Sequence, residues 1–236
     1  MGCSAGILAL HLARDVLNVH GNSLALILSM ESVAVNFYKG DTKSMLLSNC
    51  LFRMGGAGAL LSNRPPLQVR ACPHRQDPPR GQQCRLLLRN AAARRPGPHR
   101  RITQVAGEAL KENMTAVGKV VLSYWEQVAY VWGGSVPELR KGMEHFCIHA
   151  GGKAVIEAIR ERLRLRERDV EASKMALWRF GNKSSSSTWY ALAYLEANGR
   201  LETGDKVCQL AFGSGFKCNT AIWKCVSPPR IQASNV

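Results

Sequence analysis

Three side chains suited to acyl transfer stand far apart in this sequence, each beside glycine or other small residues. Cys3 lies in the opening Met-Gly-Cys-Ser-Ala-Gly, His149 precedes Ala-Gly-Gly, and Asn182 follows a glycine. A cysteine thiolate can accept an acyl group from a thioester. An imidazole N–H and an amide N–H can donate two hydrogen bonds to a thioester carbonyl and stabilise the enolate left when a malonyl unit loses carbon dioxide. Together the three residues predict decarboxylative Claisen condensation.

Each of these residues also has a plainer interpretation when taken alone. Cys3 precedes an expected helix whose dipole favours a thiolate, but a buried, unreactive cysteine fits the same position. His149 fits a hydrogen-bonded structural histidine, and Asn182 fits the start of a serine-rich linker. His145 lies four residues before His149, but no Glu follows it as in His-Glu-x-x-His, so we expect no metal site. The opening Met-Gly-Cys also resembles a lipid-attachment signal, which Gly6 breaks because Ser or Thr belongs there.

The elements expected to position Cys3 alternate between helix and strand. Residues 4–19 predict a helix with one apolar face, and residues 21–32 predict a Gly-Asn turn followed by a buried strand. Residues 43–64 predict a short helix, a glycine-rich turn and a second strand. This order is typical of a layered α/β core. The apolar face of the first helix is expected to comprise Ile7, Leu8, Leu12, Val16 and Val19.

The second half of the chain predicts further helices and a pair of strands. Residues 105–132 predict one or two helices, and residues 153–168 predict an amphipathic helix with Val155, Ile159 and Leu163 on its apolar face. Another helix is expected to begin at Ser187 or Thr188 as the N-cap and to end at Gly199. Residues 205–215 and 217–226 then predict two strands joined by a glycine turn.

Residues 64–101 differ in composition from the rest of the chain. They hold ten arginines, seven of the ten prolines and no lysine, and they carry nine of the fifteen net positive charges. No helical or strand period is visible except around Cys-Arg-Leu-Leu-Leu. Three explanations are open: a disordered basic linker, a basic arm for nucleic acid without aromatic residues for stacking, and coding sequence read out of its native frame. The concentration of charge in one segment argues against a nucleic-acid-binding surface on the folded parts.

Composition excludes several other classes of protein. No apolar run reaches the roughly 18 residues that span a bilayer, and no secretory signal is visible. The eight cysteines form no Cys-x-x-Cys pair, so a structural zinc site is not expected. Five of them have apolar or small neighbours that suit reduced thiols; these are Cys3, Cys50, Cys147, Cys208 and Cys218.

Several long segments resemble plant 3-ketoacyl-CoA synthases, relatives of chalcone synthase and of the type III ketoacyl-ACP synthases. The segments are the opening Met-Gly-Cys-Ser-Ala-Gly and those at 49–64, 144–157, 179–200 and 204–224. His149-Ala-Gly-Gly is similar to the His-Pro-Gly-Gly of chalcone synthases, and Gly-Asn182-Lys-Ser-Ser to their Gly-Asn-Met-Ser-Ser. The resemblance spans about 1–63 and 104–225.

This resemblance implies an α/β, thiolase-like layered αβαβα fold that is incomplete, holding the C-terminal part from the nucleophile onward. It divides the chain into a remainder of the N-terminal half (1–63), an irregular Arg/Pro-rich segment (64–103), the C-terminal half (104–226) and a tail (227–236). Cys3 would be the acyl-accepting nucleophile, with His149 and Asn182 as the decarboxylation and oxyanion pair. A glycine loop would shape the pocket beside the cysteine; it comprises Phe212, Gly213, Ser214 and Gly215.

The resemblance also implies substrates, partners and a location. We expect long-chain acyl-CoA and malonyl-CoA as substrates, no bound cofactor or metal, a homodimer with other elongase subunits, and the endoplasmic reticulum membrane. The family carries transmembrane segments and about half of its core before the nucleophile, where this chain begins. Lys183 stands where relatives usually have Thr or Met, which could crowd the site. The alternatives are a catalytically inactive family member and a basic protein that binds nucleic acid or a partner through residues 64–101.

Overall fold

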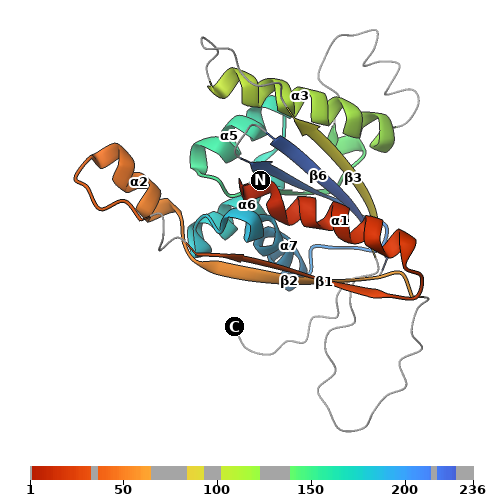
Figure 1. Cartoon of the computed structure of the whole chain (residues 1–236). Coiled ribbons are helices and arrows are strands. Elements are labelled where there is room, and N and C mark those ends of the chain that lie inside the picture. The colour runs from red at the N-terminus through yellow and green to blue at the C-terminus, as the bar shows by residue number, and fades with distance from the viewer. Residues whose placement is uncertain are drawn as a thin grey trace.

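Two β-sheets and the helices between and beside them make up the described parts of the chain. The computed structural model describes residues 2–32, 37–64, 84–92, 102–122, 139–213 and 217–226. Within these residues, β1 and β2 form a two-stranded sheet, and four strands form a second sheet in the order β3-β6-β5-β4. Figure 1 shows the two sheets on opposite sides of a helical layer.

The first sheet follows the helix that begins beside Cys3. A short 3-10 helix, η1 (Gly2–Ser4), leads into α1 (Ala5–Val19). Strand β1 (Leu24–Glu31) pairs antiparallel with β2 (Gly55–Ser62). Helix α2 (Lys43–Leu51) lies between the two strands in the sequence.

The second sheet is mixed. Strand β3 (Cys84–Ala92) pairs antiparallel with β6 (Lys217–Cys225), which pairs antiparallel with β5 (Lys206–Gly213). Strand β4 (His145–Ile148) completes the edge, parallel to β5. Because β4 and β5 run in the same direction, the segments that follow them meet at one end of the sheet.

Helices cover both faces of the four-stranded sheet. The helices are α3 (Ile102–Val121), α5 (Lys153–Arg162), α6 (Glu167–Phe180) and α7 (Ser187–Ala197), with single 3-10 turns η3 (Leu139–Lys141) and η4 (Ser184–Ser186). Helix α1 contacts β1 on one side and β5 and β6 on the other, while α3 contacts β3 and β6. The layers are therefore the β1–β2 ribbon, a layer with α1 and α7, the large sheet, and a layer with α3 and α5 (Figure 1).

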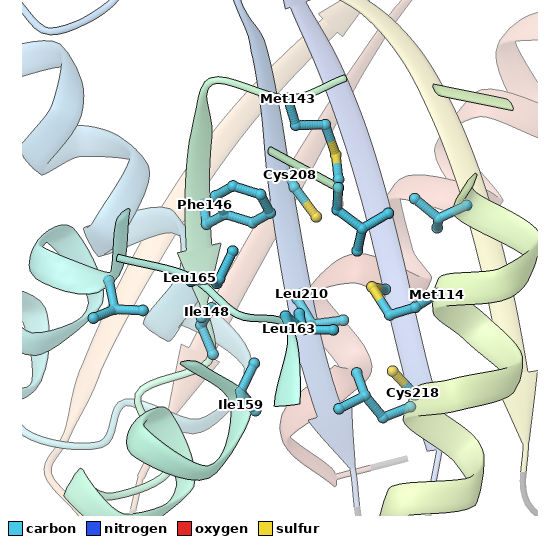
Figure 2. Packing of buried hydrophobic residues seen from close by; sticks show 14 of the residues in the cluster. Met114, Met143, Phe146, Ile148, Ile159, Leu163, Leu165, Cys208, Leu210 and Cys218 are labelled. Carbon is cyan, nitrogen blue, oxygen red and sulfur yellow. The ribbon is translucent and has the colours of Figure 1, made fainter. Parts of the chain in front are cut away.

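Alternating residues of the large sheet enter two separate hydrophobic clusters. Phe146, Ile148 and Leu210 pack toward α3 and α5 with Met114, Ile159 and other buried residues, as Figure 2 shows. The opposite face packs toward α1, α6 and α7 through Cys147, Val207, Ala211, Ala221 and Trp223. Both faces of this sheet are thus buried, which fits its nearly continuous apolar strands.

Several buried polar side chains form hydrogen bonds across these layers. Asn113 on α3 donates to the Cys218 carbonyl over 2.9 Å and accepts a hydrogen bond from Thr220. On the other face, Trp223 Nε1 donates to Gln209 Oε1 over 2.6 Å, and the Gln209 amide donates to the Thr188 carbonyl. These bonds fix the register of α3 and α7 on the sheet, since a buried polar group without a partner is costly.

The helix from residue 4 to residue 19 is confirmed, but its predicted buried face is wrong in part. Ile7 is buried as expected, whereas Leu12, Val16 and Val19 are exposed. Leu10 and Leu17 are buried in their place. The helix packs between two sheets, so contacts on both sides decide which residues are covered, and a single apolar stripe does not describe it.

The strand predicted at the segment 21–32 is present but is buried on one face only. Ile27 and Ser29 of β1 are buried, while four apolar residues that alternate with them are exposed; these are Leu24, Leu26, Leu28 and Met30. The expected glycine-rich turn is wrong, since Gly55, Gly56 and Gly58 all lie in β2. The apolar outer face of β1 is not covered by any element that the structure describes.

Other boundaries also differ from the predictions. The single helix expected over 153–168 breaks after α5 at a turn where Arg164 has a φ of 51°, and α6 begins at Glu167. Ile156 and Ile159 form the buried face of α5, and Leu163 at its C-cap is also buried, while Val155 is exposed. Helix α7 has Ser186 as its N-cap, one residue earlier than expected, and Gly199 follows its C-cap with the expected positive φ of 59°.

Within its described residues, the Arg/Pro-rich segment contributes one strand. Strand β3 begins at Cys84, the residue at which the sequence showed its only trace of strand pattern, and it extends the large sheet beside β6. Of the rest of the expected irregular segment 64–103, the structure describes Arg64, two residues after β2, and residues 102–103, which begin α3. One helix, α3, occupies the start of 105–132, and residues 123–132 also lie outside the description.

Candidate active site

Cys3 lies in η1, directly before α1, and is partly exposed. Its sulfur accepts a hydrogen bond from Ser184 Oγ over 3.3 Å. Helix α1 approaches the Ser184–Ser186 turn very closely at Gly6, where a Cβ atom would lie 2.2 Å from the Ser185 carbonyl oxygen. The absence of a side chain at Gly6 therefore permits the contact that brings Ser184 to Cys3.

Asn182 is fixed by its backbone on both sides. Gly181 ends α6 with a φ of 71°, a left-handed conformation that suits glycine. Asn182 N then donates to the Leu51 carbonyl over 2.8 Å, and its own carbonyl accepts from Arg53 N over 2.9 Å. This single parallel bridge next to Phe52 attaches Asn182 to the segment between α2 and β2.

The Asn182 side chain is buried, with an exposed fraction of 1%. Its Oδ1 accepts a hydrogen bond from Ser184 N over 2.8 Å. Its Nδ2 lies 3.4 Å from the Gly151 carbonyl oxygen, a long contact that leaves the amide able to donate elsewhere. The residue thus connects the turn at Cys3 with the loop that follows β4.

His149 follows β4 and lies in that same loop. Its backbone N–H donates to the Leu210 carbonyl of β5 over 2.8 Å, and its backbone carbonyl accepts from Gly151 N over 2.8 Å. The ring packs on Gly151, where an added Cβ would meet its Nε2 at 3.2 Å. Among the described residues, Nδ1 has no hydrogen-bond partner. Burial lowers the pKa of His149 to about 4, so the imidazole is neutral at pH 7.

The three residues singled out in the sequence are joined by one chain of contacts. Cys3 bonds to Ser184, Ser184 to Asn182, Asn182 approaches Gly151, and Gly151 lies against His149. The parallel strands β4 and β5 direct His149 to this end of the sheet, and the α6–η4 connection supplies Asn182. The geometry brings the residues together, and their chemical roles stay a prediction.

The expected pocket loop is only partly described. Phe212 and Gly213 are the last residues of β5, while Ser214 and Gly215 lie outside the described residues. Phe212 packs against the cluster that contains α3, on the face of the sheet opposite α1 and Cys3. Its side chain therefore points away from the Cys3 layer.

Two polar residues on β1 that the sequence analysis did not single out form hydrogen bonds to the Ser184–Ser186 turn. Ser29 Oγ and Ser185 Oγ are 2.6 Å apart in a buried hydrogen bond. Glu31 Oε1 accepts from Ser185 N over 3.2 Å. Ser184 was also missed as a contact of the cysteine. The only sequence signal was the serine run itself, which resembles a linker.

Lys183 does not turn toward the sulfur of Cys3. Its Nζ donates to the Met54 carbonyl just before β2, and its alkyl chain lies over Gly55. Burial and the neighbouring Arg53 guanidinium lower the pKa of Lys183. Lys183 therefore packs against the start of β2, and it does not crowd Cys3 as expected.

The other histidine and cysteine residues considered in the sequence analysis lie outside this chain of contacts. His145 Nε2 lies 2.9 Å from Asp205 Oδ2, and within the described ranges no three His, Cys, Asp or Glu side chains gather as metal ligands would. Cys147, Cys208 and Cys218 are buried free thiols, and burial raises the pKa of each. Cys50 is exposed on α2, contrary to the apolar setting expected for it.

Comparisons with known proteins identify the two halves of the chain as condensing-enzyme segments. The family described as FAE1/Type III polyketide synthase-like protein matches residues 1–75. The family described as 3-oxoacyl-[acyl-carrier-protein] synthase III C terminal matches residues 140–225. The 3-ketoacyl-CoA synthase 7 of Arabidopsis thaliana is 46% identical over 247 residues, covering 96% of this chain. The chain belongs to the 3-ketoacyl-CoA synthase family.

The chain spans about half the length of the curated relatives it matches. The alignment covers 54% of 3-ketoacyl-CoA synthase 7 and 50% of 3-ketoacyl-CoA synthase 5, which is 45% identical and also from Arabidopsis thaliana. No described helix is long and apolar enough to cross a membrane.

Solved structures show the thiolase-like fold. The 1,3,6,8-tetrahydroxynaphthalene synthase of Streptomyces coelicolor, a type III polyketide synthase, superposes with a TM-score of 0.66 at 19% identity. The C-terminal type III polyketide synthase domain of Steely1 from Dictyostelium gives 0.67 at 18% identity. Each match covers 96% of this chain, which in turn covers 61% and 60% of those chains. The α/β class and layered fold expected from the sequence are confirmed.

Proposed function

We propose that this chain carries the condensation chemistry of very-long-chain fatty acid elongation, joining a long-chain acyl-CoA to a malonyl unit from malonyl-CoA. The observation that carries the proposal is the chain of contacts from Cys3 through Ser184, Asn182 and Gly151 to His149 in a member of the 3-ketoacyl-CoA synthase family. The substrates are CoA thioesters, and none of the proposed steps needs a bound cofactor or metal.

In the first step, the Cys3 thiolate attacks the carbonyl carbon of the acyl-CoA. The new C–S bond to Cys3 forms as the C–S bond to CoA breaks, and the CoA thiolate departs. Cys3 is suited to this role because it is partly exposed and lies at the N-terminal end of the nucleophile helix α1.

In the second step, malonyl-CoA loses carbon dioxide and its thioester oxygen becomes an enolate. The neutral His149 imidazole has one N–H to donate, and the Asn182 amide supplies a second donor. The enolate carbon then attacks the acyl carbon on Cys3, the C–S bond breaks, and a 3-ketoacyl-CoA leaves with Cys3 restored as a thiolate. His149 serves as a donor here, not as a positively charged group.

The first experiment incubates the chain with a long-chain acyl-CoA and maps the acyl adduct by peptide mass spectrometry. We expect the adduct on Cys3 and its loss in Cys3→Ser, with the exposed Cys50 thiol as an internal control for nonspecific acylation. An adduct that persists in Cys3→Ser contradicts the assignment of the nucleophile.

A second measurement separates acylation from decarboxylation. His149→Ala should retain acylation of Cys3, and Asn182→Ala should retain it at a lower rate. Each variant should lower the release of carbon dioxide from labelled malonyl-CoA by about 100-fold or more, the usual cost of one oxyanion donor. Decarboxylation that proceeds normally in both variants contradicts the donor roles.

A catalytically inactive family member is the second candidate, and the exposed apolar residues of α1 and β1 favour it. Leu12 and Val19 on α1 and Leu28 and Met30 on β1 are largely exposed. A nucleophile helix that is open to water holds its charged groups in a high dielectric, which weakens electrostatic stabilisation of the enolate. A well-folded chain that forms no acyl adduct on Cys3 would support the inactive family member.

The assembly and location of the active enzyme are further proposals drawn from the family. We infer a homodimer that works with other elongase subunits at the endoplasmic reticulum membrane. A role in nucleic-acid binding is not proposed. Its test is salt-dependent retention on DNA or RNA at low ionic strength, which should be absent.

A further inference from the structure

The hydroxyl of Ser184, the first residue of η4, points at the sulfur of Cys3. Ser184 Oγ is the donor in this hydrogen bond, which spans 3.3 Å and joins residues 181 positions apart in the sequence. Neither the acylation chemistry nor the enolate chemistry described above uses this hydroxyl. The contact therefore calls for a role of its own.

The backbone of Ser184 has a conformation that serine rarely adopts. Its φ is 51°, in the left-handed region, where residues other than glycine are uncommon and strained. Such a conformation persists only where the surroundings fix it. Here it has the effect of turning the Ser184 side chain back toward η1 and Cys3.

Hydrogen bonds on both sides fix that conformation. Ser184 N donates to Asn182 Oδ1 over 2.8 Å. The next residue, Ser185, is held to β1 through its hydroxyl at Ser29 and its N–H at Glu31. The direction of the Ser184 hydroxyl is thus determined by Asn182 on one side and by the β1–β2 ribbon on the other.

We propose that Ser184 is a further catalytic residue, whose hydroxyl donates a hydrogen bond to the Cys3 thiolate whenever that thiolate is free. The proposal rests on the proposed role of Cys3 as nucleophile. A donor at sulfur stabilises the charged thiolate over the neutral acyl thioester, because hydrogen bonds to charged acceptors are the stronger ones.

The bond acts at two points of the cycle. Before acylation it orients and stabilises the Cys3 thiolate that attacks the acyl-CoA. After condensation, when the new C–C bond forms and the C–S bond to Cys3 breaks, the electron pair of that bond returns to sulfur, and Ser184 is in place to stabilise it. No proton is transferred from Ser184 in either step, so atoms and charges balance without another reactant.

Asn182 gains a second role from this arrangement. Its Oδ1 positions Ser184 through the 2.8 Å bond to Ser184 N, while its Nδ2 remains on the side of Gly151 and His149. One amide therefore serves both the thiolate and the proposed enolate site. Loss of Asn182 should lower the reactivity of Cys3 as well as decarboxylation.

The test measures the reactivity of Cys3 itself. The full chain and its Ser184→Ala and Ser184→Gly variants are treated with iodoacetamide at a series of pH values, and the alkylated peptides are quantified by mass spectrometry. The exposed Cys50 on α2 is the internal reference thiol. At pH 7 we expect the rate for Cys3 relative to Cys50 to fall about threefold to tenfold in both variants, the size of one lost hydrogen bond.

Ser184→Gly separates the loss of the hydroxyl from a loss of structure in the turn. Glycine adopts a φ of 51° without strain, so this variant removes the hydroxyl while the turn can keep its shape. If Ser184→Gly retains the circular dichroism spectrum and melting temperature of the wild type and also its Cys3 alkylation profile, the proposal is overturned. A uniform change in Cys3 and Cys50 also overturns it, because that would reflect a general loss of structure.

The assay contains neither acyl-CoA nor malonyl-CoA, so it can fail separately from the proposed function. A wild-type Cys3 that reacts faster than in Ser184→Gly supports the hydrogen bond even if no acyl adduct forms. An acyl adduct on Cys3 with equal alkylation in all three proteins supports the function and rejects the role of Ser184.

Discussion

At the scale of single residues, burial determines the chemical form of His149. Its side chain is 4% exposed, and the loss of hydration lowers its pKa from 6.5 to about 4. The ring is therefore neutral over the whole physiological range and can both donate and accept a hydrogen bond. A neutral ring also suits a donor to an enolate, since a charged imidazolium would transfer its proton to the enolate and remove the nucleophile.

The lowered pKa of His149 predicts a pH dependence of stability. Between pH 6.5 and about 4 the unfolded chain binds the proton and the folded chain does not, so the free energy of unfolding falls as the pH falls through this window. The contribution of His149 is on the order of 3 kcal/mol. Urea denaturation at pH 7, 5.5 and 4.5 should show this fall.

His149→Gln provides the control for that measurement. The variant keeps a polar side chain without a titrating group, so its free energy of unfolding should fall less between pH 7 and 4.5 than that of the wild type. Some slope remains, because burial also lowers the pKa of His11 to about 4. Identical slopes in the two proteins would contradict the assignment.

The sequence identified Cys3, His149 and Asn182 but not Ser184, and the reason is physical. Residue types and their resemblance to family segments are visible in a sequence. The contact of Ser184 with Cys3 depends on a left-handed φ and on hydrogen bonds to Asn182 and β1, which no local pattern encodes. A run of four serines is indistinguishable from a linker until the elements around it are placed.

At the scale of elements, the close approach of α1 to the serine turn depends on Gly6. In an isolated helix, Gly6→Ala should stabilise by about 1 kcal/mol. Here the new Cβ would lie 2.2 Å from the Ser185 carbonyl oxygen and 3.3 Å from Trp189 Nε1, so α1 must move away from the turn. Such overpacking costs about 1–3 kcal/mol, and the clash outweighs the helix propensity.

Gly6→Ala is therefore expected to lower the free energy of unfolding and to lower alkylation of Cys3, because the Ser184 contact is lost. Gly21→Ala is the matched control, since nothing lies within 4 Å of its added Cβ. Urea denaturation and iodoacetamide labelling of both variants test this. A Gly6→Ala chain as stable as Gly21→Ala and as reactive at Cys3 as the wild type would rule out the steric argument.

The order of elements was predictable from apolar periodicity and turn residues, whereas the buried faces were not. In α1 the stripe through Leu12, Val16 and Val19 was as apolar as the face that is buried. In β1 residues of both faces are apolar, which predicts burial on two sides. Only the packing partner of each face decides the outcome, and for the outer face of β1 the described residues supply none.

At the scale of the whole molecule, the two faces of the β1–β2 ribbon differ in what they contact. Ile27 is 6% exposed and packs with α1, while its neighbour Leu28 is 67% exposed on the outer face. Leu24, Leu26 and Met30 on β1 and Leu60 on β2 share that outer face. An apolar surface of this kind promotes association between molecules.

Leu28→Lys and Ile27→Lys form a matched pair on this ribbon. Leu28→Lys should change the free energy of unfolding by no more than about 0.5 kcal/mol and reduce both dye binding and self-association. Ile27→Lys buries an unpaired charge and should cost about 3–5 kcal/mol. Chemical denaturation, ANS fluorescence and light scattering measure the three effects. Equal destabilisation by the two variants would show that the outer face is covered in solution.

The hydrogen bond between Ser184 and Cys3 has a consequence for biosynthesis. The two residues are 181 positions apart, and chains are made at about 5–20 residues per second, so Cys3 leaves the ribosome roughly 9–36 s before Ser184. During that interval the Cys3 thiol is outside the ribosome before the Ser184–Ser186 turn that later contacts it has been made. Chaperones and cellular reductants that act on nascent chains would therefore meet this cysteine in a state that the finished fold never displays.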